Sequence, residues 1–400
     1  MNNSSPLGNR DLIRAINRSI ILNTIKTYGP IDRAQVARVT GLSPATVTGI
    51  TSELIETGLI FEKAPGDSRG GRPPILLAIN PKGGYVIGIK LMEDHALGAL
   101  TDLEATVIAK DQVQLPDQSA TNVIRMLARL VERLISKAGI GKKKLIGVGI
   151  GLAGIVDFER GLLRQSPFFG WRDLPIRELL QPHVKVPIYL DNDVNTLSMA
   201  EQWFGAAQGI EDFLTLTVGR GIGLGIVANG RFYRGTGGGA GEFGHTLVDP
   251  DGPICDCGKR GCLETYVAYP GLLRDAQLFN PNIKTMDELL DLNEKMDPEI
   301  ISVLRKAGDL LGRSVANLIN LLNPKLIIVG GEGVGLGKNF FDPMQSAIQK
   351  YSVSEMFRDC QIRIEPWGDD AWTRGAASLV LRQLFENPVH QSEFNFFQGS

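Results

Sequence analysis

One histidine and three cysteines stand within eighteen residues of this sequence, namely His245, Cys255, Cys257 and Cys262. Three thiolates and one imidazole form a closed tetrahedral set of zinc ligands, which leaves no position for a catalytic water. Gly258 and Gly261 allow the loop between the cysteines to turn tightly. A chance cluster or a disulfide is the alternative, but thiols in a chain without a secretory signal are expected to stay reduced. The spacing therefore predicts a structural zinc site.

Carboxylates stand on both sides of this cluster, at Glu242 and Glu264. A second polar group, from Asp191 to Asn195, directly follows the apolar segment 187–190. Side chains of this kind at the end of a strand can contact a ligand. Because Asp and Asn after a strand are also common helix N-caps, the pattern alone leaves ligand contact and helix capping open.

The bulk composition is that of an ordinary globular protein. The chain has 400 residues, of which 43% are hydrophobic and 22% charged, and its length suggests two or three domains. It has no long apolar run and no signal pattern at its N-terminus, so we expect a cytoplasmic protein without membrane insertion. The net charge is −2, but residues 1–80 hold nine Lys or Arg against six Asp or Glu. Any DNA-binding activity is therefore expected at the front of the chain.

The first sixty residues predict three helices. A helix over residues 11–27 is followed by a short helix that begins after Asp32, a good N-cap. Gly41 makes the next turn, and a third helix opens at Ser43 with Pro44 in its first position. Short helix, glycine turn and third helix follow the helix-turn-helix plan, in which the last helix enters the major groove of DNA.

This third helix has two predicted faces. Its buried stripe consists of Val47, Ile50 and Leu54. The candidate DNA contacts near its N-terminal end are Ser43, Ala45, Thr46 and Thr48. Since the helix carries no Lys or Arg, bases would be read by small polar groups and methyl contacts.

Two short strands, over residues 59–63 and 75–79, are predicted after the third helix. The glycine-rich loop between them carries Arg69 and Arg72, which suit phosphate contacts or a narrow minor groove. The whole segment reads as a winged helix-turn-helix. A three-helix interaction module with a basic loop is the alternative.

From Gly84 onward, strands and helices alternate with glycine-rich joints, which is typical of an α/β fold. We expect strands at 85–90, 144–150, 187–190, 213–218 and 326–329, and helices at 122–138 and 301–322.

These segments together resemble the ROK family (repressors, open reading frames and kinases) over nearly the whole chain. The most specific part is the block Gly241-Glu-Phe-Gly-His followed by the cysteine loop and Leu263-Glu264. The winged helix resembles the sugar-responsive repressor branch, whose members act on xylose, N-acetylglucosamine and glucose-linked genes. The resemblance implies a winged helix-turn-helix plus a two-lobed α/β domain of the actin/hexokinase-like (ribonuclease H-like) type. The expected parts are a DNA-binding domain over 1–80, lobe 1 over 81–192 with a C-terminal helix at about 373–390, and lobe 2 with the zinc loop over 193–372.

The resemblance also implies a sugar site in the cleft between the lobes. By the family's motifs, the sugar-binding residues would be Gly154, Asn192, Asp193, Glu242, His245 and Glu264. Asp193 stands where the kinases keep their general base, a carboxylate that accepts the proton of the attacking hydroxyl. His245 could serve zinc with one ring nitrogen and the ligand or another acceptor with the other. The chain departs from the family at Ala153 and at Phe168-Phe169, which leaves the identity of the sugar open.

A kinase of this family needs a first phosphate loop of the form Asp-x-Gly-Gly-Thr. The chain instead reads Lys90-Leu-Met-Glu-Asp94, so the aspartate is a lysine and both glycines carry side chains. The second loop, residues 219–225, keeps the glycines but has Arg220 in place of threonine, which decides nothing by itself. We therefore expect no catalytic residues and no enzymatic activity.

The resulting hypothesis is a DNA-binding transcriptional regulator, a repressor of sugar-metabolism genes, with structural Zn²⁺ supporting a monosaccharide-sensing cleft. Its partners would be operator DNA and a monosaccharide effector, and the family resemblance implies a homodimer or a dimer of dimers. Two alternatives stay open: a sugar kinase that phosphorylates a hexose with ATP, and a regulator controlled by a protein partner.

Overall fold

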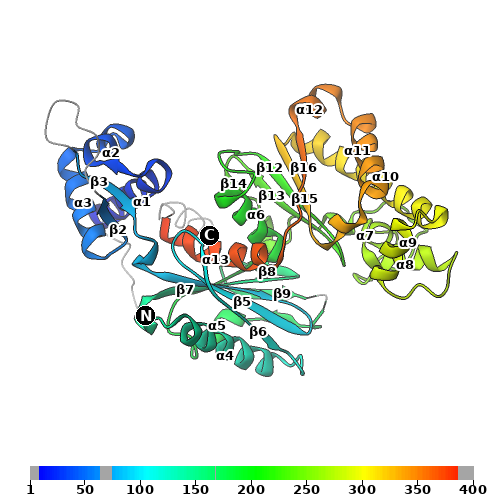
Figure 1. Ribbon diagram of the computed structural model, residues 1–400, viewed down its shortest axis with the longest axis horizontal. Helices are drawn as coiled ribbons and strands as arrows, with labels where there is room; N and C mark the ends of the chain where they lie inside the picture. Colours follow the sequence, from blue (N-terminus) through cyan, green and yellow to red (C-terminus); the bar gives the residue numbers. More distant parts are fainter. Residues whose placement is uncertain (1–8, 64–73, 167, 386–400) are drawn as a thin grey trace, which may run out of the picture.

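The computed structural model describes residues 9–63, 74–166 and 168–385. A helical N-terminal domain lies at one end of the molecule, and two five-stranded sheets with their own helices follow (Figure 1). The fold class predicted from the sequence is confirmed. None of the described helices is both long and apolar enough to span a bilayer.

The N-terminal domain has three helices and a small antiparallel sheet. Its elements are α1 (Asn9–Tyr28), β1 (Ile31–Asp32), α2 (Arg33–Thr40), α3 (Pro44–Glu56), β2 (Ile60–Lys63) and β3 (Leu76–Ile79). Asp32 caps α2 by accepting a hydrogen bond from the Gln35 N–H at 2.8 Å, and Ser43 caps α3 through the Thr46 N–H at 3.1 Å. The predicted helix starts are therefore confirmed. The sequence did not predict β1, which pairs antiparallel with β3 beside β2.

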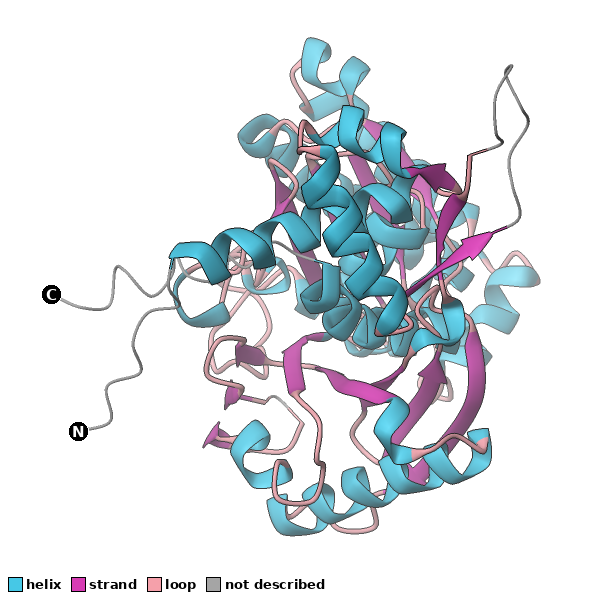
Figure 2. Cartoon of the chain, turned by 90° about the vertical axis from the view of Figure 1, so that its left-hand side faces the viewer, coloured by secondary structure: helices cyan, strands magenta, loops and turns pink. Residues whose placement is uncertain are grey.

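The first large sheet has the strand order β11-β7-β4-β5-β6. Its strands are β4 (Tyr85–Leu91), β5 (His95–Thr101), β6 (Val107–Gln114), β7 (Leu145–Leu152) and β11 (Ile188–Asn192). Helix α4 (Ala120–Ala138) covers one face and the C-terminal helix α13 (Asp369–Phe385) the other. Figure 2 shows this sheet with a helical layer below it and the remaining helices above. The close approach of α13 requires glycine at Gly88, where a Cβ would collide with the carbonyl of Thr373.

A small antiparallel sheet and a short helix border this layer. They are β8 (Ile155–Asp157), β9 (Leu162–Gln165), β10 (Arg172–Leu174) and α5 (Ile176–Leu180). Helix α13 lies where the sequence predicts a C-terminal helix over about 373–390, and the part of that span after Phe385 lies outside the described residues.

The second large sheet has the order β14-β13-β12-β15-β16. Its strands are β12 (Phe213–Val218), β13 (Ile222–Ala228), β14 (Arg231–Phe232), β15 (Leu326–Gly330) and β16 (Gln361–Ile364). Its helices are α7 (Glu264–Val267), α8 (Tyr269–Gln277), α9 (Met286–Glu294), α10 (Pro298–Leu322), α11 (Lys338–Tyr351) and α12 (Ser354–Asp359). The core between them is apolar and includes the fully buried Leu311 and Phe340. Helix α6 (Asp193–Phe204) packs against β12 and β13 on one side and against α13 on the other, so it links the two large sheets.

Candidate ligand cleft and metal centre

The four predicted zinc ligands lie together. The ligand atoms of His245, Cys255, Cys257 and Cys262 all fall within 4.8 Å of one another. The Sγ atoms of Cys257 and Cys262 are 3.7 Å apart, and Cys255 Sγ lies 3.5 Å from His245 Nδ1. Zn–S bonds of about 2.3 Å in a tetrahedron place ligand atoms roughly 3.8 Å apart. The donor set therefore fits a tetrahedral zinc ion, and none of the three cysteines forms a disulfide.

Tight backbone turns bring these ligands together. The Cys255 N–H donates to the Lys259 carbonyl at 2.7 Å, and the Gly258 N–H donates to the Cys255 carbonyl at 2.8 Å. Gly261 has φ +67°, and a Cβ there would collide with the Asp249 carbonyl. The two glycines are therefore required, as the sequence predicted.

The two ring nitrogens of His245 face different groups. Nδ1 faces the cysteine sulfurs, and Nε2 lies 3.7 Å from Glu242 Oε2, beyond hydrogen-bond distance. A carboxylate on this side of the ring could orient a metal-binding imidazole if the two groups came closer. Burial raises the pKa of the Cys255 thiol to about 12, and a bound divalent cation would favour its thiolate instead.

Strand β11 ends at Asn192, whose side chain makes two contacts. Its Oδ1 accepts the Val194 N–H at 2.8 Å, and its Nδ2 donates to the Gly154 carbonyl at 3.1 Å. The helix-capping role that the sequence left open is therefore present, and the same amide joins Gly154 to the start of α6.

The predicted acidic residues of the cleft share one environment. Burial raises the pKa of the Glu242 carboxyl, His245 lowers it, and the charges of Glu264 and Asp193 raise it further. Glu264 Oε2 also accepts the Ile222 N–H at 3.0 Å. Residues predicted from three separate segments thus lie within electrostatic reach of one another.

Lys90, which the sequence resemblance predicts at the aspartate position of a phosphate loop, lies near the end of β4. Its Nζ pairs with Asp193 Oδ2 and sits 4.2 Å from the centroid of the Trp372 ring. The side chains of Lys90 and Asp193 are only 10% and 13% exposed. The other Asp193 oxygen, Oδ1, lies 2.9 Å from the Val194 N, whose single N–H it shares with Asn192 Oδ1.

The two loops that would hold phosphates are joined by a second ion pair. Arg220 Nη2 lies 3.2 Å from Glu93 Oε2, and the guanidinium stands 4.8 Å from the Phe168 ring. Both partners of the ion pair are well exposed, so the pair contributes little stability. Its side chains nevertheless occupy the space between the two loops.

Sequence reasoning missed an ion pair beside the cleft. Arg234 Nε donates to Asp191 Oδ2 at 2.8 Å, and the guanidinium lies 4.5 Å from the Phe158 ring. Asp191 is 1% exposed at its side chain and adjoins Asn192 in the chain. The polar run 191–195 signalled this carboxylate, but nothing in the sequence signalled its partner.

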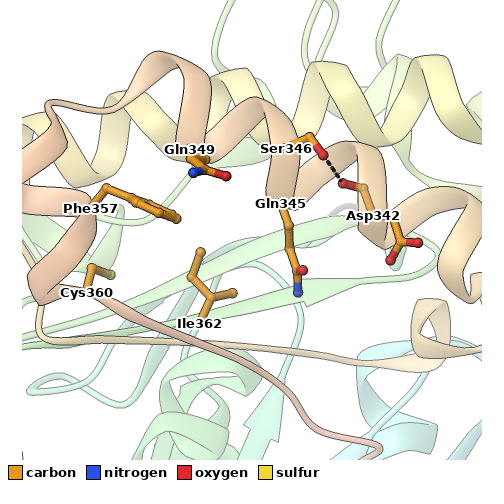
Figure 3. A pocket seen from close by; sticks show the side chains of 7 residues that line it. All are labelled: Asp342, Gln345, Ser346, Gln349, Phe357, Cys360 and Ile362. Carbon is orange, nitrogen blue, oxygen red and sulfur yellow. Dashed lines mark hydrogen bonds between the residues drawn. The ribbon is translucent and has the colours of Figure 1, made fainter.

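Two other features lie outside this site. Trp171 stacks on Phe169 with their ring centroids 4.2 Å apart, and it packs against the core of the first large sheet. A groove of about 460 Å³ opens between α11, α12 and β16 (Figure 3). Burial raises the pKa of Cys360 in this groove to about 11, so its thiol is unreactive.

The predicted DNA-facing residues are placed only in part. Ala45 and Thr48 are exposed on α3, Ser43 acts as the N-cap, and Thr46 is half-buried beside it. Arg69 and Arg72 lie outside the described residues.

These features define a two-lobed α/β protein with a helix-turn-helix domain at its N-terminus. Residues 86–383 match the model of the ROK family, and the chain belongs to that family. It is 30% identical to the xylose repressor of Caldicellulosiruptor bescii over 398 residues, which is 96% of this chain and all of the relative.

Two solved structures are similar to this fold. A ROK family transcriptional regulator, a homologue of the E. coli MLC protein, superimposes with a TM-score of 0.85 at 25% identity, covering 95% of this chain and 99% of the other. The ROK glucokinase of Streptomyces griseus, in complex with glucose and AMPPNP, gives a TM-score of 0.65 at 28% identity and covers 74% and 99%. The regulator therefore matches nearly the whole chain, and the glucokinase matches about three quarters of it.

Proposed function

We propose that this protein is a DNA-binding transcriptional repressor of sugar-metabolism genes, and that a monosaccharide bound between its lobes changes its affinity for operator DNA. The observation that carries the proposal is the Lys90–Asp193 pair, which sits in the position of a kinase's reacting groups within a chain that also has a helix-turn-helix domain. The full-length similarity to a protein named xylose repressor supports the same conclusion.

The sugar would lie among Gly154, Asn192, Asp193, Glu242, His245 and Glu264. Carboxylates and an imidazole make directed hydrogen bonds to neighbouring hydroxyls, and charge-assisted bonds of this kind are the stronger ones. The half-exposed Glu242 and His245 offer accessible polar atoms, while Asn192 and Asp193 would act from the start of α6.

Zinc would hold the loop that presents these groups. The closed set of three thiolates and one imidazole leaves no open coordination position, so we assign the ion a structural role. His245 would belong to both sites, because its Nδ1 faces the sulfurs and its Nε2 faces Glu242.

DNA binding would use the exposed N-terminal part of α3, with Ala45 and Thr48 toward the bases. Arg69 and Arg72 in the wing would add phosphate or minor-groove contacts. A homodimer or a dimer of dimers would place two such helices on successive half-sites.

The competing function is a sugar kinase with an added DNA-binding domain. Asp193 at the general-base position favours it, whereas the lysine paired with that carboxylate, where the family's kinases would have an aspartate, opposes it. Transfer of phosphate from Mg-ATP to a hexose, lost in Asp193→Ala, would establish the kinase.

The deciding experiment is a titration of operator DNA, isolated by selection from genomic fragments, against the zinc-loaded protein with and without each common pentose and hexose. We expect at least one sugar to change the operator affinity about fivefold or more, the usual lower range of allosteric coupling. Operator binding that ignores every sugar would refute the sensing function, and control by a protein partner would then be tested by pull-down with sugar transporters.

A further inference from the structure

Three helices from separate parts of the chain meet at one junction. Helix α1 belongs to the N-terminal domain, α6 begins at the proposed sugar site, and α13 ends the described chain (Figure 1). Their apolar side chains form one cluster, which joins Leu22 of α1 to Val380 of α13 and to Trp203 of α6. The DNA-binding domain therefore has a direct packed contact with the helix that carries Asp193.

Lys26 of α1 lies at the centre of this junction. Its Nζ stands 3.0 Å from the centroid of the Trp203 ring, 5.3 Å from Phe385 and 5.9 Å from Phe204. An ammonium over the face of an indole is a cation–π contact, and such contacts become stronger when they are shielded from water. Lys26 forms no ion pair within the described part of the chain, so the aromatic rings are its main partners there.

Helix α1 is also fixed to the end of α13. The side chains of Ser19 and Asn23 both donate to the Phe385 carbonyl. Trp203 meets the Phe385 ring edge-on at 5.6 Å. The rings of Trp203, Phe204 and Phe385 form an aromatic cage around Lys26. This cage is built from α6 and α13 together, and α1 contacts both helices at the same place.

The opposite end of α6 carries the sugar residues. Asn192 caps the helix and Asp193 begins it, whereas Trp203 and Phe204 end it. Twelve residues at 1.5 Å each make α6 about 18 Å long. Helix α6 packs closely on α13, where a Cβ on Gly375 would lie 2.6 Å from the Thr196 carbonyl. Because close-packed interiors transmit strain, a tilt of α6 at Asp193 would displace Trp203 at its other end.

From this geometry we infer that Lys26 in the aromatic cage of Trp203, Phe204 and Phe385 is the contact that passes the ligand state of the cleft along α6 to the DNA-binding domain. The inference rests on the proposed sugar-sensing function. Lys26 is a positioning residue in this scheme: it touches neither sugar nor DNA. Ligand contact with Asn192 and Asp193 would shift α6, and the cage would carry α1 with it.

The charged state of Lys26 depends on the rings of its aromatic cage. Burial lowers the pKa of Lys26 to about 7, whereas the ring faces favour the charged form. A shift of α6 that opened the cage would remove this compensation, so the two positions of α6 would differ in free energy. Such a difference between two states is what coupling requires.

The test uses the full-length, zinc-loaded protein at pH 6.5, with the operator and the effector sugar found above. Lys26→Met keeps the length of the side chain and removes the charge, Lys26→Arg keeps the charge, and Arg14→Gln is a matched control on the exposed side of α1. Operator affinity is measured by fluorescence anisotropy with and without sugar, and sugar affinity by calorimetry without DNA.

We expect Lys26→Met to bind sugar with wild-type affinity. The ratio of its operator affinities without and with sugar should fall below about twofold, whereas allosteric coupling normally gives a ratio of about 5-fold or more. Lys26→Arg and Arg14→Gln should keep the wild-type ratio. A wild-type ratio in Lys26→Met would overturn the inference. A wild-type protein without any sugar response would instead refute the proposed function, so the two failures are distinguishable.

Trp203→Leu provides a second variant in case Lys26→Met is unstable, which a thermal melt would reveal. Trp203→Leu should show the same loss of the sugar-dependent change in operator affinity. The double variant should lose no more than either single variant, because both substitutions remove the same contact between Lys26 and the Trp203 ring. Additive losses would show that the two residues act independently and would also overturn the inference.

Discussion

The buried pair of Lys90 and Asp193 makes a quantitative prediction. Both side chains are about nine-tenths buried, and the ammonium also lies 4.2 Å from the Trp372 ring. Removing one member of a buried pair leaves the other charge without compensation, which costs about 3–5 kcal/mol. We therefore expect Lys90→Met to lower the free energy of unfolding of the lobes by roughly 2–4 kcal/mol, since the slight exposure of both groups reduces the penalty.

The double variant Lys90→Met/Asp193→Asn is the matched control. It removes both charges and keeps the Asn side chain able to accept the Val194 N–H that Asp193 accepts now. Replacing a buried pair by uncharged groups is often neutral. Its free energy of unfolding should therefore lie within about 1 kcal/mol of wild type, well above that of Lys90→Met.

Urea denaturation measures these differences. Fluorescence follows the four tryptophans of the chain, of which Trp372 lies directly over Lys90. Because the chain has several domains, the transitions must be fitted separately and not as a single two-state step. The reasoning is refuted if Lys90→Met loses less than about 1 kcal/mol, or if the double variant is as unstable as the single one.

Three further predictions follow from the site and the junction. Chelation of the metal, or Cys255→Ser, should abolish the sugar response and lower the melting temperature, because a metal that binds only the folded site stabilises the fold. If atomic emission finds no metal in the native protein, this role of a metal is refuted. Glu264→Gln should weaken sugar affinity by roughly tenfold to 100-fold, because one hydrogen bond to a charged group contributes about 1.5–3 kcal/mol. Its operator affinity without sugar should change little. If calorimetry shows an unchanged sugar affinity, Glu264 is not part of the sugar site. Finally, burial lowers the pKa of Lys26 in the folded protein from 10.5 to about 7. Between about pH 7 and pH 10.5 the unfolded chain therefore binds one more proton than the folded chain, and the free energy of unfolding should rise with pH in the wild type but not in Lys26→Met. A difference in unfolding free energy between the two proteins that does not change with pH would show that the rings keep Lys26 charged.

Local chemistry explains which parts of the fold were predictable. Asp32, Ser43 and Pro44 are helix-start signals that act within one turn, and each begins a helix as expected. The cluster of His245 and three cysteines was predictable for the same reason, since these residues and the two glycines between them lie in a short segment. Strand β1 was missed because two residues carry no periodic pattern and its pairing with β3 depends on a segment more than forty residues away.

Long-range pairing explains what the sequence could not show. Lys90 was recognised as foreign to a phosphate loop, but its partner Asp193 is 103 positions away. Arg234 carried no signal at all, although it pairs with Asp191 beside the predicted site. The cage around Lys26 joins residues separated by more than 300 positions, which only the packing of α1 and α6 on α13 brings together. Spacing along the chain has no information about such contacts.

Three carboxylates at or near the proposed sugar site are paired with cations of the protein itself. Lys90 pairs with Asp193, Arg220 with Glu93, and Arg234 with Asp191. A triphosphate with its metal ion would have to break the first two pairs, and it would meet the carboxylate of Glu93 where a kinase offers glycine N–H groups. An uncharged sugar would bring no charge to the site, and its hydroxyls need only hydrogen-bonding groups, of which Glu242 and His245 are half-exposed. Under the proposed function, the same substitutions would disfavour a nucleotide and favour a neutral ligand that binds between the lobes and biases the position of α6.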